Sequence, residues 1–154
     1  PKALKSFRGV KRRFSYKINK NNLILIDDYA HHPTEINALH QAVTEMYPNH
    51  KKQIVFQPHL FSRTKDFGVE FAESLSAFDE IILLDIYPAR EKPIEGITSN
   101  WLLKMINNDC KVIAQKNQLS TMLKDSDCIV KLMVGAGDIG AEVDVVTKSL
   151  NYEN

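Results

Sequence analysis

The chain is poor in cysteine and lacks long apolar runs, and each shortage excludes a class of protein. Two cysteines among 154 residues cannot supply the framework of a disulfide-rich secreted domain. Cys110 and Cys128 have no metal-type spacing and each sits beside apolar residues, so we expect two buried free thiols in a cytoplasmic protein. No apolar run approaches the ~20 residues that span a bilayer and no signal peptide is visible, so we expect no membrane partner.

The chain also lacks an excess of charge of either sign. Twenty basic and 19 acidic residues give a net charge of +1, which offers no case for a nucleic-acid partner. The basic residues near the start are expected to form a solvated face; they are Lys2, Lys5, Arg8, Lys11, Arg12 and Arg13. An apolar content of 44% is enough for one domain with a core. Because the chain begins in what looks like the end of a helix over 2–7, we expect it to be a piece of a longer protein.

Two catalytic signatures are missing. Without a G-x-x-x-x-G-K-[ST] loop the chain alone cannot cradle a nucleoside triphosphate in the P-loop manner, and without G-x-S-x-G a hydrolase of that type is disfavoured. The segment GAGDIG at 135–140 matches G-x-G-x-x-G, but the chain ends before the strand and acidic residue that a dinucleotide site requires. We interpret it as a tight turn that directs helix amide groups toward a ligand.

What the chain does contain is an alternation of short apolar strands and amphipathic helices. The expected strands lie at 13–18, 23–26, 53–56, 80–86, 111–114 and 127–134. The expected helices lie at 34–47, from Thr64 or Asp66 to about 76, from Thr98 or Ser99 onward, at 118–124 and after 140. Near-continuous apolar strands separated by helices predict a three-layer α/β domain with a mostly parallel sheet, to which the first two strands add an antiparallel hairpin.

Polar residues follow the ends of these strands. The segment LILIDDYAHHPTEI at 23–36 runs from a buried strand through ionisable side chains into a helix start at Pro33. Similar polar connections, QPHLFSRT, YPARE and GAGD, follow three later strands. Since the carboxyl ends of parallel strands share one rim of a sheet, these connections are expected to meet there. The side chains that should converge are Asp28, His31, His59, Arg63, Tyr87, Arg90 and Asp138.

Several of these residues allow more than one interpretation. The guanidinium of Arg63 suits bidentate capture of a carboxylate or phosphate, although a salt bridge to Asp28 is compatible with the same position. Tyr29 and Tyr87 are either pocket walls or core aromatics. The acidic and histidine side chains of 27–32 could suit a metal ion, but their spacing matches no ligand pattern, so we expect no metal site.

Five motifs resemble one family in content and in order. FRGVKRRF, IDDYAHHPTEI, FQPHLFSRTKDF, LLDIYPAREKPIEGITS and VGAGDI follow one another as in the carboxyl-terminal domain of Mur ligases. The resemblance covers nearly the whole chain and implies that 1–154 form one Rossmann-like domain of a three-domain, cytoplasmic enzyme of peptidoglycan synthesis. The domain that holds the UDP sugar and the P-loop ATPase domain would lie outside this sequence.

Within the family, the double histidine and the QPH…RT and DIYPA segments are most similar to the alanine-adding member. The resemblance implies an ADP-forming ligase that joins L-alanine to UDP-N-acetylmuramate through an acyl phosphate. ATP and Mg²⁺ would be bound mainly by the central domain. The present domain alone would be inactive and would contain no catalytic residue of its own. A recycling ligase that adds a preformed peptide, and a stand-alone nucleotide- or metabolite-binding module, remain alternatives.

The resemblance also implies an amino-acid site. Arg63 and His31 would hold the alanine carboxylate, and Tyr29 with His59 would shape a pocket small enough for a methyl group. Some family members carry Arg directly after the QPH histidine, where this chain has Leu60, which leaves more of the carboxylate binding to Arg63.

A nucleotide site is implied in the same way. The family's aspartate of the DY segment falls on Asp28 and its arginine of the RRF segment on Arg13, and both would meet the adenosine part of ATP. Tyr87, Arg90 and Asp138 are expected at the rim without an assigned role.

Overall fold

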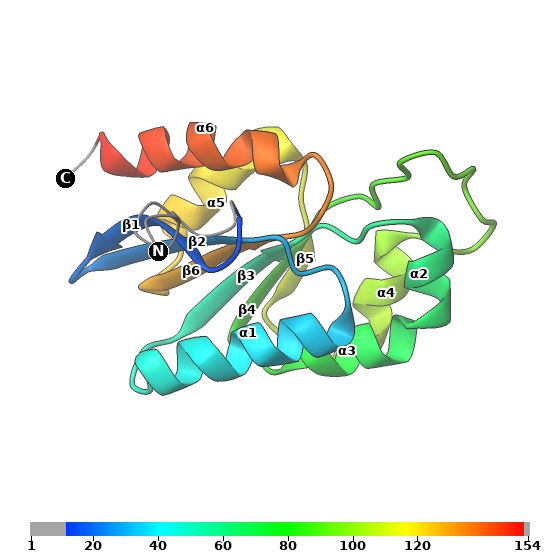
Figure 1. Ribbon diagram of the computed structural model, residues 1–154, viewed down its shortest axis with the longest axis horizontal. Helices are drawn as coiled ribbons and strands as arrows, with labels where there is room; N and C mark the ends of the chain where they lie inside the picture. The colour runs from blue at the N-terminus through cyan, green and yellow to red at the C-terminus, as the bar shows by residue number, and fades with distance from the viewer. Residues whose placement is uncertain (1–11, 153–154) are drawn as a thin grey trace, which may run out of the picture.

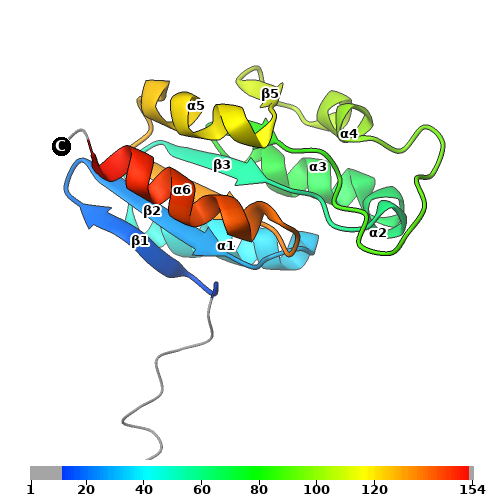
Figure 2. The same cartoon turned by 90° about the horizontal axis from the view of Figure 1, so that it is seen from above.

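The computed structural model describes residues 12–152 as a six-stranded sheet between two layers of helices (Figures 1 and 2). The strands are β1 (Ser15–Lys20), β2 (Leu23–Asp28), β3 (Lys52–Phe56), β4 (Glu80–Leu83), β5 (Lys111–Ile113) and β6 (Val130–Val134). Their order in the sheet is β1-β2-β6-β3-β4-β5. Only the β1–β2 pair is antiparallel and the other neighbouring pairs are parallel. The α/β fold with an antiparallel hairpin is therefore confirmed; the helix expected over 2–7 lies outside the described residues.

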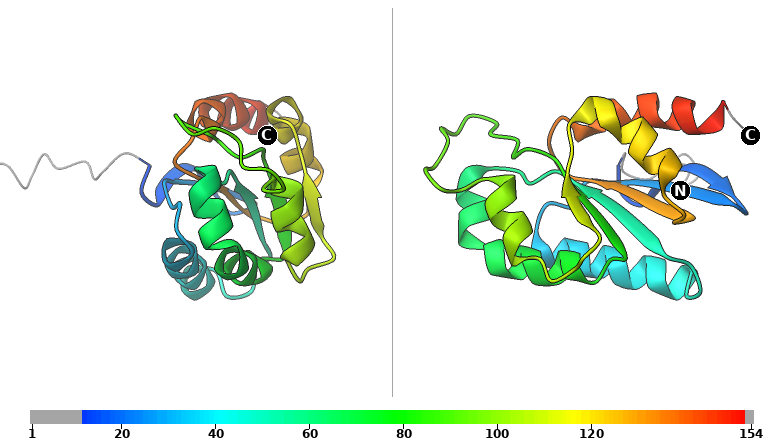
Figure 3. Two further views of the ribbon diagram at one scale, coloured as in Figure 1. Left: turned by 90° about the vertical axis from the view of Figure 1, so that its right-hand side faces the viewer. Right: turned by 180° about the vertical axis from the view of Figure 1, so that it is seen from behind.

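Helices cover both faces of the sheet. They are α1 (Pro33–Met46), α2 (Phe61–Asp66), α3 (Gly68–Ser76), α4 (Ser99–Met105), the 3₁₀ turn η2 (Lys116–Gln118), α5 (Leu119–Asp125) and α6 (Ile139–Asn151). Helices α1, α3 and α4 pack on one face, and α5 and α6 on the other, as Figure 3 shows from the edge of the sheet. The three expected layers are present.

The period-2 geometry of the strands divides the core into two clusters. Ile54 and Phe56 of β3 point to the α1 side, whereas Val55 between them points to the α6 side. All three are 0% exposed. Burying a side chain of this size contributes roughly 1.5–3 kcal/mol, so a central strand buried on both faces is a main source of the stability of the fold.

Several element boundaries differ from the sequence expectation. Strand β1 runs from Ser15 to Lys20 instead of over 13–18. The helix expected up to about residue 76 begins earlier, at Phe61, and is interrupted at Phe67 between α2 and α3. Gly68 begins α3 where a Cβ atom would lie 2.4 Å from the Trp101 ring, so this close approach requires glycine. Strand β4 ends at Leu83 instead of residue 86, and β6 begins at Val130 instead of residue 127.

The prediction of two buried thiols is half wrong. Cys128 is buried and Cys110 is exposed, and both are free. Cys110 directly precedes the short edge strand β5, which has a neighbour on only one side, so no second strand covers that position.

Candidate functional site

The connections that follow β2, β3, β4 and β6 meet at one edge of the sheet, on the right-hand side of Figure 1. Asp28 ends β2, and its carbonyl accepts a hydrogen bond from the Gly135 amide after β6 at 3.1 Å. His59 follows β3 and pairs as an isolated parallel bridge with Tyr87, which follows β4. Four connections far apart in sequence therefore build one rim, as parallel topology requires.

Four rings form a continuous row along this rim. The centroids of Tyr29 and His31 lie 5.5 Å apart, those of His31 and His59 6.3 Å, and those of His59 and Tyr87 5.6 Å, the last pair stacked. Tyr29 is 43% exposed and the other three are half-buried. Both tyrosines are therefore rim residues and not core aromatics.

Arg63 joins this row through His59. Its Nη1 lies 3.2 Å from His59 Nδ1 and donates to the His59 carbonyl oxygen at 3.5 Å, one helical turn away. Burial, followed by the charges of Arg63 and His31, lowers the pKa of His59, so the imidazole is neutral at pH 7 and can accept from the guanidinium.

No carboxylate among residues 12–152 lies within 4.0 Å of Arg63, so the salt bridge to Asp28 considered from the sequence is not formed. The half-buried guanidinium lies at the rim and is suited to hold an incoming anion.

The positive φ of Leu60 places Arg63 next to the rings. Leu60 has φ 72° and ψ 133°, which is unusual for a residue with a Cβ atom. Its amide donates to the Tyr87 carbonyl at 2.9 Å, and its carbonyl accepts from Thr64 N at 3.1 Å and Thr64 Oγ1 at 2.8 Å. These bonds start α2 immediately after the QPH segment. Backbone strain of about 1–3 kcal/mol is typical of functional sites where surrounding contacts hold it.

The second histidine of the HH pair has a structural role. His32 is the N-cap of α1 and takes part in a capping box with Glu35. Its ring lies edge-on to Phe67, with centroids 4.6 Å apart. Glu35 Oε2 also accepts from the His31 amide at 2.8 Å and lies 3.4 Å from His31 Nδ1, so the capping carboxylate orients the rim histidine.

A pocket of about 430 Å³ lies beside the row, between the start of β1 and helix α1. Arg13, Asp28, Tyr29 and His31 are among its lining residues. The Asp28 carboxylate accepts from Phe14 N at 2.7 Å and from Ala30 N at 2.8 Å. Each carboxylate oxygen retains a second acceptor direction for a ligand hydroxyl. The two residues assigned to the nucleotide by resemblance therefore share one pocket.

Arg12 departs from the expected solvated face. Its Nε donates to both oxygens of Asp27 at 3.1 and 3.2 Å, its Nη2 donates to Gly135 O at 2.8 Å, and its guanidinium lies 5.5 Å from the Tyr29 ring centroid. Asp27 is 1% exposed, and burial raises its pKa although Arg12 opposes that effect. A carboxylate inside an apolar strand needs a cation nearby. The position of Asp27 at the end of such a strand could therefore have indicated a basic partner from the sequence.

Gln57 is a second residue that the sequence did not single out. Its Nε2 donates to Asp138 Oδ1 at 2.7 Å and its Oε1 accepts from Ile139 N at 2.9 Å, so it holds the start of α6 to β3. Asp138 also pairs with Lys116. Although burial opposes them, the hydrogen bonds from Lys116 and Gln57 keep the pKa of Asp138 low. Asp138 therefore lies at the rim and fixes the loop.

Arg90 is not brought to the ring row. It lies exposed in a turn of the connection between β4 and α4, next to Ala89 at φ 51°. We find no hydrogen bond or ion pair within the described part of the chain that joins it to the row. The same connection is anchored one residue later, where Glu91 accepts from Ser62 N at 3.0 Å.

Two further findings concern metal ions and membranes. Residues 12–152 contain no group of three or more His, Cys, Asp or Glu side chains placed to hold a metal ion. Over the same residues, no helix has the length and apolar character needed to cross a bilayer.

Comparisons with known proteins identify similar chains. Residues 12–137 match the family model for the Mur ligase, glutamate ligase domain. UDP-N-acetylmuramate--L-alanine ligase of Christiangramia forsetii is 65% identical over 152 residues, which is 99% of this chain and 34% of that protein.

Solved structures of similar proteins share the fold of this chain. UDP-N-acetylmuramate-alanine ligase MurC from Thermotoga maritima aligns with TM-score 0.75 and 29% identity, over 99% of this chain and 33% of that one. A murein peptide ligase from Psychrobacter arcticus aligns with TM-score 0.71 and 17% identity, over 99% of this chain and 32% of that one, and shares the fold. The chain spans about a third of the length of the relatives it matches.

Proposed function

The chain belongs to the Mur ligase family, and on that premise we propose that residues 1–154 are the carboxyl-terminal domain of a ligase that joins L-alanine to UDP-N-acetylmuramate. The observation that carries the proposal is the Arg63 guanidinium, held by His59 at the ring row with no carboxylate within 4.0 Å among the described residues. The 65% identity to an alanine ligase supports alanine as the amino acid.

In this proposal Arg63 and His31 hold the carboxylate of the amino acid. The guanidinium offers parallel N–H donors to both carboxylate oxygens, which fixes the direction of the amine. Tyr29 and His59 form the walls around the side chain; their ring centroids lie 5.5 and 6.3 Å from that of His31 between them, and this spacing favours a methyl group. The rim would therefore choose the amino acid and aim its nitrogen away from the sheet.

The chemistry would take place at the junction with a neighbouring domain. ATP would convert the muramate carboxylate to an acyl phosphate and ADP, and the amine would then attack the acyl carbon and release phosphate through a tetrahedral intermediate. Holding the amine against the acyl phosphate lowers the barrier through proximity. Closure of the rim over the site would exclude the water that hydrolyses acyl phosphates. This domain would supply orientation and no nucleophile, so it would be inactive alone.

ATP would contact this domain through Asp28 and Arg13 in the pocket of about 430 Å³. An exposed arginine and a carboxylate with free acceptor directions suit a ribose and its neighbouring phosphate. The described residues offer no metal cluster, so we assign no step here to Mg²⁺, which would belong with the P-loop domain. The proposal includes the cytoplasmic location expected from the sequence.

A recycling ligase that adds a preformed peptide is the second candidate, because a murein peptide ligase shares the fold. The test is a panel of amine substrates given to the intact protein that carries this chain, with ATP and UDP-N-acetylmuramate and phosphate release as the readout. The panel contains L-alanine, glycine, L-serine and an L-alanyl peptide. We expect the highest kcat/KM for L-alanine. A preference for the peptide would establish the recycling enzyme, and no phosphate release with any amine would favour a stand-alone binding module.

A further inference from the structure

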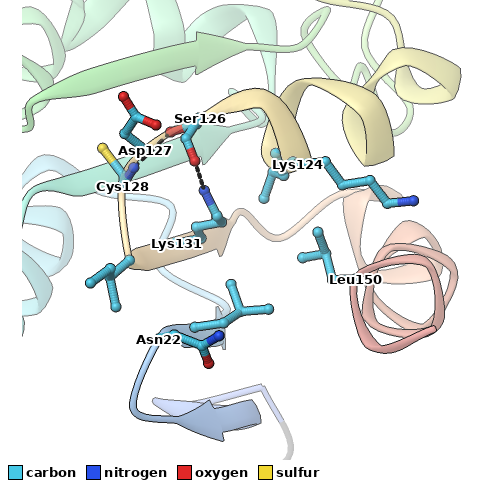
Figure 4. Close-up of a pocket in the computed structure, with 10 residues that line it drawn as sticks. Asn22, Lys124, Ser126, Asp127, Cys128, Lys131 and Leu150 are labelled. Carbon is cyan, nitrogen blue, oxygen red and sulfur yellow. Dashed lines mark hydrogen bonds between the residues drawn. The ribbon is translucent and has the colours of Figure 1, made fainter. Parts of the chain in front are cut away.

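Two cations at opposite edges of the sheet differ in how the chain holds them. Near the amino end of β6, the Lys131 ammonium donates to the Ser126 carbonyl oxygen at 3.0 Å, as Figure 4 shows. At the carboxyl edge, Arg63 is bonded to His59 and has no carboxylate within 4.0 Å among residues 12–152. The Arg63 guanidinium is therefore open to a further anion, and a carboxylate of the same chain lies near enough to compete for it.

That carboxylate belongs to Glu91, in the connection between β4 and α4. The connection is tied to the start of α2, because the Tyr87 carbonyl accepts from the Leu60 amide at 2.9 Å. A turn follows, in which the Glu91 amide donates to the Pro88 carbonyl at 2.9 Å. The turn brings Glu91 back to the start of α2, the helix that carries Arg63.

Ser62 of α2 binds both oxygens of the Glu91 carboxylate. Its hydroxyl donates to Oε1, and its amide donates to Oε2 at 3.0 Å. These two hydrogen bonds lower the pKa of Glu91, and the charge of Arg63 adds a smaller effect in the same direction. The carboxylate is therefore charged at neutral pH, and it is bound to the serine and not to the neighbouring arginine.

Glu91 acts on the rim through its charge without forming an ion pair. It raises the pKa of His59, which burial and then the charges of Arg63 and His31 lower. A guanidinium is a strong partner for a carboxylate, because it offers two parallel charge-assisted hydrogen bonds. A rotation of the Glu91 side chain would exchange the bonds from Ser62 for those from Arg63. The hydrogen bonds from Ser62 therefore decide where this negative charge lies.

We propose that Ser62 is a positioning residue that holds the Glu91 carboxylate away from Arg63 and so keeps the guanidinium available to the carboxylate of the amino-acid substrate. The inference rests on the function proposed for Arg63. Without the serine hydroxyl, one oxygen of the carboxylate is released, and Glu91 turns onto Arg63 as an internal competitor of the substrate. Since a high substrate concentration displaces an internal competitor, KM rises and kcat is unchanged.

Steady-state kinetics of the intact protein that carries this chain measure the competition. In Ser62→Ala the KM for L-alanine should rise about two- to fivefold, as expected from competition by an exposed ion pair. The values of kcat and of the KM for UDP-N-acetylmuramate should not change. Ser62→Thr keeps the hydroxyl and should keep the wild-type KM. Ser62→Ala/Glu91→Gln should restore the wild-type KM, because a neutral amide does not compete for the guanidinium.

The matched control uses Glu95, which is exposed in the same connection. Ser62→Ala/Glu95→Gln removes the same amount of negative charge but leaves the Glu91 carboxylate in place, so the raised KM of Ser62→Ala should persist. If both double variants restore the KM equally, the effect comes from the overall charge of the connection, and the proposal is overturned.

A second readout uses the 154-residue chain and does not depend on ligase activity. The chain covers both faces of its sheet with its own helices, and NMR follows the titration of the His59 ring. In Ser62→Ala the Glu91 charge moves onto Arg63, whose Nη1 lies 3.2 Å from His59 Nδ1, and offsets the positive charge there. The pKa of His59 should therefore rise above its wild-type value. In Ser62→Ala/Glu91→Gln it should return to the wild-type value or fall below it.

The two readouts separate this inference from the proposed function. If the wild type uses L-alanine, an unchanged KM or an unchanged His59 pKa in Ser62→Ala overturns the inference and leaves the function standing. A fall in kcat that Glu91→Gln does not rescue would show a purely structural role for Ser62 and also overturns it. If the wild type does not use L-alanine, the proposed function fails, whereas a raised His59 pKa in Ser62→Ala would still support the restraint of Glu91 by Ser62.

Discussion

Replacing Arg12 by methionine tests the account of how the rim is held together. Arg12 neutralises Asp27, whose side chain is 2% exposed, and it also bonds the Gly135 carbonyl at 2.8 Å. Removing one partner of a buried ion pair costs about 3–5 kcal/mol. Since the Arg12 side chain is 21% exposed, solvent screens part of the interaction. We therefore expect the free energy of unfolding to fall by the lower end of this range, about 3 kcal/mol. For a chain of this size that lowers Tm by about 6–12 °C.

The loss of stability caused by Arg12→Met should depend on pH. Burial raises the pKa of Asp27 and Arg12 counteracts it, so in Arg12→Met the folded-state pKa rises further. The native variant then binds a proton more readily than its unfolded chain. The destabilisation relative to wild type is therefore full at neutral pH and shrinks as pH falls through that raised pKa.

Urea unfolding from pH 7.5 to 4.5 measures this effect. Arg13→Met is the matched control, because Arg13 is exposed, and it should stay within about 0.5 kcal/mol of wild type. The double variant Arg12→Met/Asp27→Asn should recover much of the loss, since no buried charge remains. An Arg12→Met cost below about 1 kcal/mol, or one that is independent of pH, would refute the reasoning.

Two further predictions concern the rim loop and the nucleotide. In Gly137→Ala the added methyl would lie 2.4 Å from Gln57 Oε1 and 2.7 Å from Tyr87 Cβ, so the loop must shift at about 1–3 kcal/mol, and an unchanged urea midpoint would contradict the tight packing. The isolated chain should bind ATP weakly or not at all, because most contacts belong to the P-loop domain; titration calorimetry giving a micromolar dissociation constant would disprove this.

The order of the elements could be predicted because it depends on local periodicity. Residues 54–56 are apolar throughout, and β3 is buried on both faces as such a run predicts. The break at Phe67 could not be predicted in the same way. It depends on Gly68 approaching Trp101, which is far away in the sequence.

Only part of the candidate site could be predicted from the sequence. The parallel topology expected from the sequence is enough to predict that His59 and Tyr87 share one rim. The pairing of Arg12 with Asp27, and the bridge that Gln57 makes to α6, required the third dimension. Arg12 lies before β1, and its carbonyl accepts a hydrogen bond from the Tyr29 amide at 2.6 Å, which places it, among the adjacent basic residues, beside the buried carboxylate.

The measurement that tests the central claim most directly compares Arg63→Met with Lys65→Met in the intact ligase. Both variants remove one positive charge from α2, but only Arg63 adjoins His59. Losing a charge-assisted hydrogen-bond pair worth about 1.5–3 kcal/mol should raise the KM for L-alanine about 10- to 100-fold, with the KM for UDP-N-acetylmuramate unchanged. Lys65→Met should change neither. Equal increases in both KM values for Arg63→Met, or an unchanged KM for L-alanine, would contradict the claim that this guanidinium holds the amino-acid carboxylate.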